Sequence, residues 1–245
     1  MQLMTLTREN ADWVAVHLAA ASEFIDTDPE RAHQHALSAA RKGGRIAVVR
    51  EALAITAYAT GDFALALREL RTFRRISGSN EQIALMVDSE RGVGRPDKAL
   101  ELGRSVEKNE LSVPVQVSLA IAMSGARLDL GQPELALHEL EIPQLDPERA
   151  FSWSPELFGA YANVLEDLGR EADAAAWRDR AERAERALEI EFGSDDVFEV
   201  FDLDEGDDFD EQSDAPGPAD SDDADSGIDE GDDVSPEASV DPEVK

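Results

Sequence analysis

The chain has 245 residues, of which 42% are hydrophobic, so it is long enough to bury a sizeable core. Its 54 acidic and 23 basic residues give a formal net charge of −31, which argues against direct binding of nucleic acid by the intact chain. The absence of cysteine excludes disulfide bonds, thiolate nucleophiles and cysteine-ligated zinc.

The sequence also shows no feature of a membrane protein. Glu9, Asp12, His17 and Glu23 interrupt the N-terminal segment, which therefore lacks the unbroken apolar run of a secretory signal. No window approaches the roughly 18 apolar residues that cross a bilayer. We therefore expect a soluble, cytoplasmic protein with no membrane partner.

Taken in chain order, the spacing of apolar residues predicts helices that follow one another in pairs, after a loose segment at residues 1–12 in which Asn10 is a candidate helix cap. The predicted pairs are 13–24 with 29–43, 45–60 with 63–76, 80–92 with 96–108, 113–130 with 133–141, and 155–168 with 171–191. Asp28 and Ser154 each precede a proline and are predicted N-caps. No stretch alternates with a period of two residues, so we expect an all-α fold.

A short motif recurs where each later pair turns from its first helix into its second. It consists of a glycine, four further residues and an alanine, as in Gly61 to Ala66. The motif alanines, including a degenerate first copy, are Ala32, Ala66, Ala99, Ala136 and Ala174. The intervals between them are 34, 33, 37 and 38 residues, which is typical of a repeat built from two helices.

This pattern resembles the tetratricopeptide repeat (TPR) family, in which a small residue of the first helix packs against the alanine of the second. The corresponding small positions are Ala20, Ala54, Ser124 and Ala162, with Val87 as a departure, while Gly103 and Arg178 stand where the family has bulky apolar residues. The resemblance covers residues 13–191 and implies a right-handed helical solenoid of about five antiparallel pairs, which we assign to residues 13–192. Another array of helical hairpins, or a simple bundle, is the alternative.

The resemblance further implies that the first helices line a concave groove that binds a protein or peptide. The candidate groove residues are His17, Phe24, Glu51, Ile55, Tyr58, Asp88, Arg91, Leu128, Asn163 and Glu166. Only Asn163 and Arg91 suggest the carboxylate clamp of the family's chaperone-binding members, so the sequence argues against such a clamp. The alternative is that many of these side chains are ordinary solvated residues.

A second candidate site is basic. The candidate anion surface comprises Arg41, Lys42, Arg45, Arg68, Arg71, Arg74 and Arg75. It could bind nucleic acid or an acidic peptide. Alternatively, these side chains complement helix C-termini and cover exposed helix faces.

The third feature is the acidic segment 193–245, whose 22 acidic residues and one basic residue give a net charge of −21 and leave −10 for residues 1–192. Its distal part has the composition of a disordered chain. Its proximal part places apolar side chains between acidic ones, at Val197, Phe198, Val200, Phe201 and Leu203. This motif is a candidate recognition segment that orders on a partner or docks within the chain; the alternative is a solubilising tail.

Catalysis finds no support in the sequence. The histidines, His17, His33, His35 and His138, lack a metal-binding spacing, and the glycines form no phosphate-binding loop. We therefore expect no catalytic residue, no metal and no cofactor. The sequence favours a non-catalytic scaffold or adaptor that binds a peptide or helix, with an acidic tail for autoregulation or for basic partners. The alternative is a nucleic-acid-linked factor, in which the tail mimics a polyanion or the Arg41 to Arg75 surface binds RNA.

Overall fold

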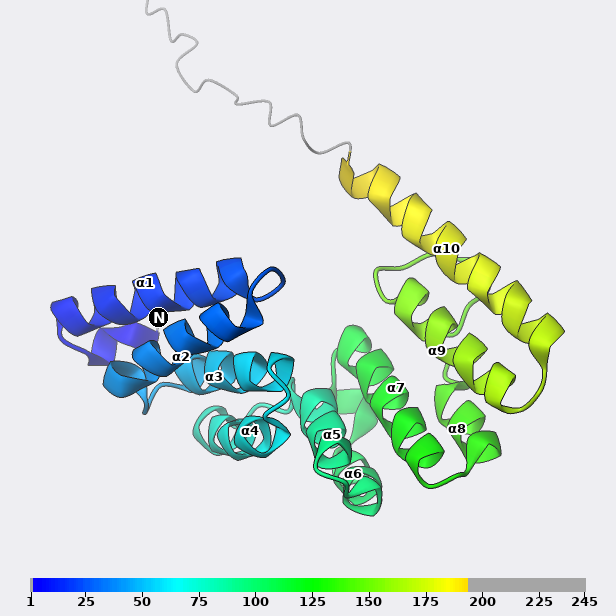
Figure 1. Cartoon of the computed structure of the whole chain (residues 1–245), viewed down its shortest axis with the longest axis horizontal. Coiled ribbons are helices and arrows are strands. Elements are labelled where there is room, and N and C mark those ends of the chain that lie inside the picture. The colour runs from blue at the N-terminus through cyan, green and yellow to red at the C-terminus, as the bar shows by residue number, and fades with distance from the viewer. Residues whose placement is uncertain (1, 194–245) are drawn as a thin grey trace, which may run out of the picture. The chain divides into compact units, whose positions relative to one another are not determined.

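The computed structural model describes residues 2–193, and these residues form ten α-helices, two short 3-10 helices and no strand (Figure 1). The predicted all-α fold is therefore confirmed for the described residues. The α-helices are α1 (Arg8–Phe24), α2 (Pro29–Gly43), α3 (Ala47–Ala59), α4 (Phe63–Ser77), α5 (Ile83–Gly92), α6 (Pro96–Gly103), α7 (Val113–Asp129), α8 (Pro133–Leu140), α9 (Ser154–Asp167) and α10 (Glu171–Gly193). The 3-10 helices are η1 (Gln2–Thr5) and η2 (Lys108–Glu110). Within this range no helix has the length and apolar character needed to cross a bilayer.

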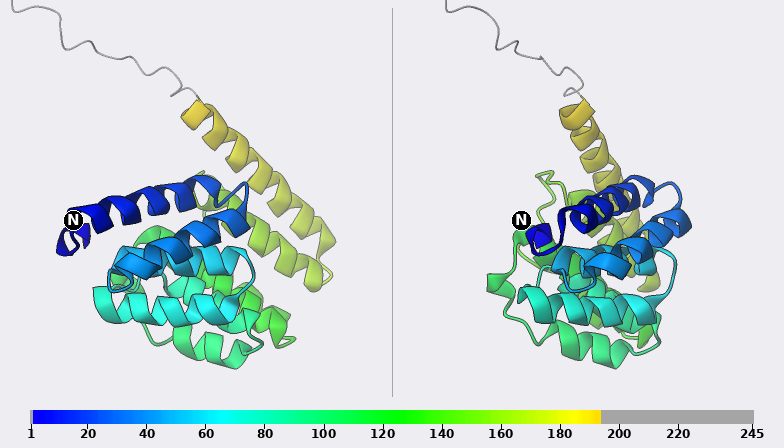
Figure 2. Two further views of the ribbon diagram at one scale, coloured as in Figure 1. Left: turned by 60° about the vertical axis from the view of Figure 1, so that its left-hand side comes forward. Right: turned by 90° about the vertical axis from the view of Figure 1, so that its left-hand side faces the viewer.

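Each helix packs on its neighbour in chain order. The two helices of every pair lie side by side, as the different views agree (Figures 1 and 2). Of the first helices of the pairs, α1 packs on α3, and α7 packs on α5 and α9, whereas α3 and α5 are joined mainly through α4.

The glycine of the repeated motif ends the first helix in four of the pairs. Gly61, Gly94, Gly131 and Gly169 all have a positive φ, between 67° and 80°. Each donates its N–H to a carbonyl three residues back, and the following residue donates to a carbonyl five residues back, as for Gly61 to Tyr58 and Asp62 to Ala57, both at 2.9 Å. This is the Schellman arrangement, which requires a left-handed residue that glycine adopts without a steric penalty.

The alanine of the motif lies where the two helices of a pair approach each other. All five motif alanines are completely buried, as are Ala54, Val87 and Ala162 on the first helices. Ser124 is also buried, whereas Ala20 is partly exposed. Small side chains allow helix axes to come close. The predicted burial is found at every one of these positions except Ala20.

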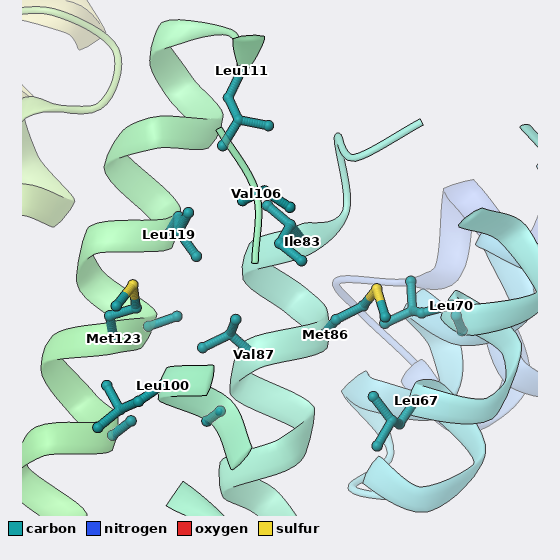
Figure 3. Close-up of a cluster of buried hydrophobic side chains, with 14 residues drawn as sticks. Leu67, Leu70, Ile83, Met86, Val87, Leu100, Val106, Leu111, Leu119 and Met123 are labelled. Carbon is teal, nitrogen blue, oxygen red and sulfur yellow. The ribbon is translucent and has the colours of Figure 1, made fainter. Parts of the chain in front are cut away.

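The largest apolar cluster runs through α3 to α7, so the pairs do not have separate cores. Figure 3 shows that α5 contributes to both sides: Met86 is directed toward Leu70 of α4, whereas Val87 is directed toward α7, which carries Leu119 and Met123. Smaller clusters join α1 and α2 to α3, and a further cluster joins α7 to α10. Burial between neighbouring pairs therefore stabilises helices that are too short to be stable alone.

Some predicted local details are wrong. Residues 1–12 are not loose where described, because η1 covers residues 2–5 and α1 begins at Arg8, capped by the Thr7 hydroxyl, which accepts from the Asn10 amide at 3.4 Å. Ser154 does not cap α9, since its hydroxyl accepts from the Phe151 amide at 3.0 Å.

The helix predicted at 96–108 ends at Gly103. A Cβ atom added to Gly103 would lie only 2.7 Å from the Sδ of Met123, so the glycine lets α6 approach α7 closely. Met123 occupies the space that a bulky residue at 103 would fill.

Candidate functional site

The first helices carry two hollows. The apolar hollow lies between α1 and α3 and has a volume of about 270 Å³. Its lining is mainly aliphatic and consists of Leu18, Ala21, Ser22, Ile25, Val48, Glu51, Ala52, Ile55 and Thr56. It can receive one large apolar side chain, whose burial would be worth about 1.5–3 kcal/mol.

The polar hollow lies next along the chain, has a volume of about 430 Å³, and is lined by residues of α3, α5, α7 and α9 and of the segment before α5. Its polar lining consists of Tyr58, Glu81, Gln82, Asp88, Arg91, Ser118 and Glu156, and its apolar lining of Ala84, Leu85, Pro114, Val115, Ile121 and Ala122. A hydrogen bond joins the two hollows, because Gln82 of the polar hollow donates to Glu51 of the apolar hollow at 2.8 Å. We refer to both hollows together as the groove.

A charged network fixes the wall of the polar hollow. The hydroxyl of Tyr58 donates to Asp88, the guanidinium of Arg91 lies 2.5 Å from the other oxygen of Asp88, and its Nε lies 2.8 Å from Asp129. These bonds connect side chains of α3, α5 and α7. Burial, and then the bond to Asp88, raises the pKa of Tyr58 to about 12, so the hydroxyl stays a donor at neutral pH.

Gly125 makes room for the guanidinium of this network. A Cβ atom added there would lie 2.4 Å from the Cζ of Arg91. Arg91 is thus held between two carboxylates of its own chain. Its charge is compensated, which agrees with the sequence argument against a carboxylate clamp.

The structure brings together half of the predicted groove residues. Glu51 and Ile55 line the apolar hollow, and Tyr58, Asp88 and Arg91 line the polar hollow. The unpredicted members include Gln82, Glu81 and Glu156, which lie just before or at the start of first helices.

The other predicted groove residues contact neighbouring helices. On α1, the Nδ1 of His17 lies 2.8 Å from the Nδ1 of His35 of α2, and the ring of Phe24 stacks on His35 with centroids 5.9 Å apart. Neither residue lines the groove. Burial and then His35 lower the pKa of His17.

The remaining three lie in the C-terminal pairs. Leu128 packs against the apolar cluster shared by α7 to α10. On α9, Glu166 pairs with Arg178 of α10, and Asn163 lies 3.5 Å from the same guanidinium. Arg178 therefore forms an ion pair between α9 and α10.

The predicted anion surface is divided by two buried carboxylates. Glu69, 3% exposed, pairs with Arg50 at 2.5 Å and with Arg68 at 3.0 Å. Glu90, also 3% exposed, pairs with Arg71 at 2.7 Å and with Arg95 at 2.8 Å. Because these arginines neutralise buried charge, Arg68 and Arg71 are structural ion-pair partners.

The rest of the basic residues separate into two groups. Arg41, Lys42 and Arg45 line a hollow of about 710 Å³ at the junction of α2 and α3, together with Arg50 and without an acidic lining residue. Arg74 and Arg75 lie in the last turn of α4, where they complement the helix dipole. Lys42 also places its ammonium 4.6 Å from the centroid of the Trp13 ring.

The predicted tail motif lies outside the described residues. Within residues 2–193 no group of three or more histidine, aspartate or glutamate side chains could hold a metal ion. Comparisons with models of known protein families and with curated proteins find no match.

Proposed function

We propose that residues 13–192 form a right-handed solenoid of the tetratricopeptide type. The support is the agreement of two independent features with the repeat pattern: the completely buried motif alanines and the identical glycine caps. In such an array each pair is stabilised by its neighbours, and one face of the first helices is left for a ligand.

We further propose that the protein is a non-catalytic, cytoplasmic scaffold that binds a peptide or helix in the groove. The observation that carries this proposal is the adjacency of an apolar and a polar hollow on the first helices, joined by the Gln82 to Glu51 bond. An apolar pocket with a few fixed polar groups beside it is the usual composition of a binding site.

The experiment compares two tryptophan substitutions in the full-length chain. Ser22→Trp fills the apolar hollow from an exposed position of α1, whereas Glu23→Trp places the same side chain on the adjacent exposed residue outside the hollow. Proteins captured from a cytoplasmic extract would be identified by mass spectrometry. Partners that bind the wild type and Glu23→Trp but not Ser22→Trp support the proposal. If every captured protein binds all three forms equally, the groove is not the binding site.

A nucleic-acid-linked role is a second candidate. It is favoured by the hollow at the α2 to α3 junction, whose lining includes Arg41, Lys42 and Arg45 besides the paired Arg50 and no acidic residue. Its test is RNA binding as a function of salt, with the charge reversals Arg41→Glu and Arg45→Glu compared with Arg74→Glu and Arg75→Glu. RNA binding that decreases with salt, and that is weakened by Arg41→Glu and Arg45→Glu but not by the other two substitutions, would support this role. Absence of RNA binding at low salt would remove it.

A further inference from the structure

The polar hollow carries an excess of negative charge. Three carboxylates line it, those of Glu81, Asp88 and Glu156, against the single guanidinium of Arg91. That guanidinium is already bound to Asp88 and to Asp129, which lies beside the hollow. The groove therefore presents uncompensated carboxylates to a ligand.

Glu81 and Glu156 differ from Asp88 in their bonding. Asp88 is occupied by Tyr58 and Arg91. Glu81 accepts one bond, from the hydroxyl of Ser112 at 3.1 Å, and the side chain of Glu156 forms no hydrogen bond or ion pair within the part of the chain that the structure describes. Both side chains are exposed, and neither forms an ion pair within the described residues, so each carboxylate is accessible to a cation.

The apolar hollow lies close enough to the polar hollow for one short peptide segment to contact both. Ile55 of the apolar hollow and Tyr58 of the polar hollow lie on one face of α3, and three residues of helix correspond to roughly 4.5 Å along its axis. A bound helix brings side chains three or four residues apart onto one face, which matches adjacent hollows.

We infer that the groove recognises a segment of another protein that carries a lysine or arginine within about four residues of a large aliphatic side chain. This inference rests on the proposed function, because it assigns a chemistry to the ligand of the same groove. The cation pairs with Glu81 and Glu156, and the aliphatic side chain enters the apolar hollow. Charge complementarity selects the ligand, since an acidic segment would be repelled by the same carboxylates.

The test is selection of dodecapeptides from a displayed random library on the immobilised full-length chain. The same selection is made on Ser22→Trp, on Glu23→Trp, and on the double variant Glu81→Gln with Glu156→Gln, which removes both charges and keeps the side-chain shapes. All four proteins contain the same acidic residues 193–245, so peptides that bind only this segment are enriched on all of them and can be subtracted. Circular dichroism confirms that each variant keeps its helix content.

The inference predicts that the peptides lost on Ser22→Trp, and kept on Glu23→Trp, combine a lysine or arginine with a large aliphatic residue. A synthetic peptide of this kind should bind the double glutamine variant at least about tenfold more weakly than the wild type. If the Ser22-dependent peptides lack a basic residue, or bind the double variant as tightly as the wild type, the inference is wrong while the proposed groove remains. If no peptide depends on Ser22, both are wrong.

Discussion

Replacing Gly131 by alanine should destabilise the protein although the added methyl group contacts nothing. Gly131 has a φ of 67°, and no atom lies within 4 Å of a Cβ atom built on it. The cost is therefore conformational, about 1–2 kcal/mol for a left-handed residue with a side chain. The unfolded alanine variant has a smaller conformational entropy, which offsets about 0.4–1 kcal/mol of this cost. We therefore expect the free energy of unfolding to fall by about 1 kcal/mol.

The matched control is Gly159→Ala. Gly159 lies inside α9, and it too has no atom within 4 Å of an added Cβ, but its φ is not positive. The same chemical change should therefore stabilise the protein, by about 0.5–1 kcal/mol.

Urea unfolding of both full-length variants, followed by circular dichroism at one temperature, gives the two shifts in midpoint. The reasoning is refuted if both midpoints move in the same direction. Gly131→Asn should lie between alanine and the wild type, because asparagine tolerates the left-handed conformation.

Three further predictions concern the pair contacts and the titrating groups. Ala66→Leu should lower the stability by about 1–3 kcal/mol, because Ala66 is completely buried between helices. Ala64→Leu, at an exposed position of the same helix, should change the stability by no more than about 0.5 kcal/mol. Equal effects of the two substitutions in thermal unfolding would contradict the close approach of the helices. The lowered pKa of His17 means that the unfolded chain binds more protons below about pH 6.5, so stability should fall as the pH drops through this range. His17→Asn should reduce that fall in denaturation series at several pH values, and an unchanged slope would show that His17 does not contribute. The raised pKa of Tyr58 favours its neutral form in the fold, so the stability that this side chain contributes should be lost as the pH rises from about 10 to 12. In Tyr58→Phe the increase in phenolate absorbance near pH 12 should be absent. If this increase persists in the variant, another tyrosine causes it.

The helix pairs could be predicted from the sequence because the residues that determine them act locally. A left-handed residue after a helix favours glycine, and a close helix crossing requires a small side chain, so Gly61 and Ala66 mark a turn and a crossing wherever they recur. The boundaries were less accurate. The start of α1 at Arg8 is accompanied by a cap from the Thr7 hydroxyl, and α6 ends at Gly103, beside Met123 of α7, which is distant in the sequence.

The groove could be predicted only in part, because the spacing of residues along a helix does not determine which neighbouring helix a side chain contacts. Ile55 and Tyr58 face the hollows, whereas His17 faces the second helix of its own pair, although all three were assigned to the same layer. The rotation of each helix about its axis decides this, and it is set by packing across the whole pair.

The number of unpaired basic side chains could not be predicted for a related reason. In the sequence Glu69 counts as one opposing charge among several arginines. In the fold Glu69 is buried and pairs with Arg50 and Arg68, so part of the positive charge of these arginines is compensated.

The succession of contacts along the chain has a consequence for biosynthesis. Extensive contacts join helices that are at most two places apart in chain order, so little loop-closure entropy opposes folding, and a pair can pack soon after it leaves the ribosome. The apolar hollow is lined by residues of α1 and α3 and the C-cap Ile25, so it can form once α3 has been synthesised. The polar hollow, which includes Glu156, is complete only after α9 has been synthesised. The two halves of the groove are thus built at different times, and the half that carries most of the charge comes last.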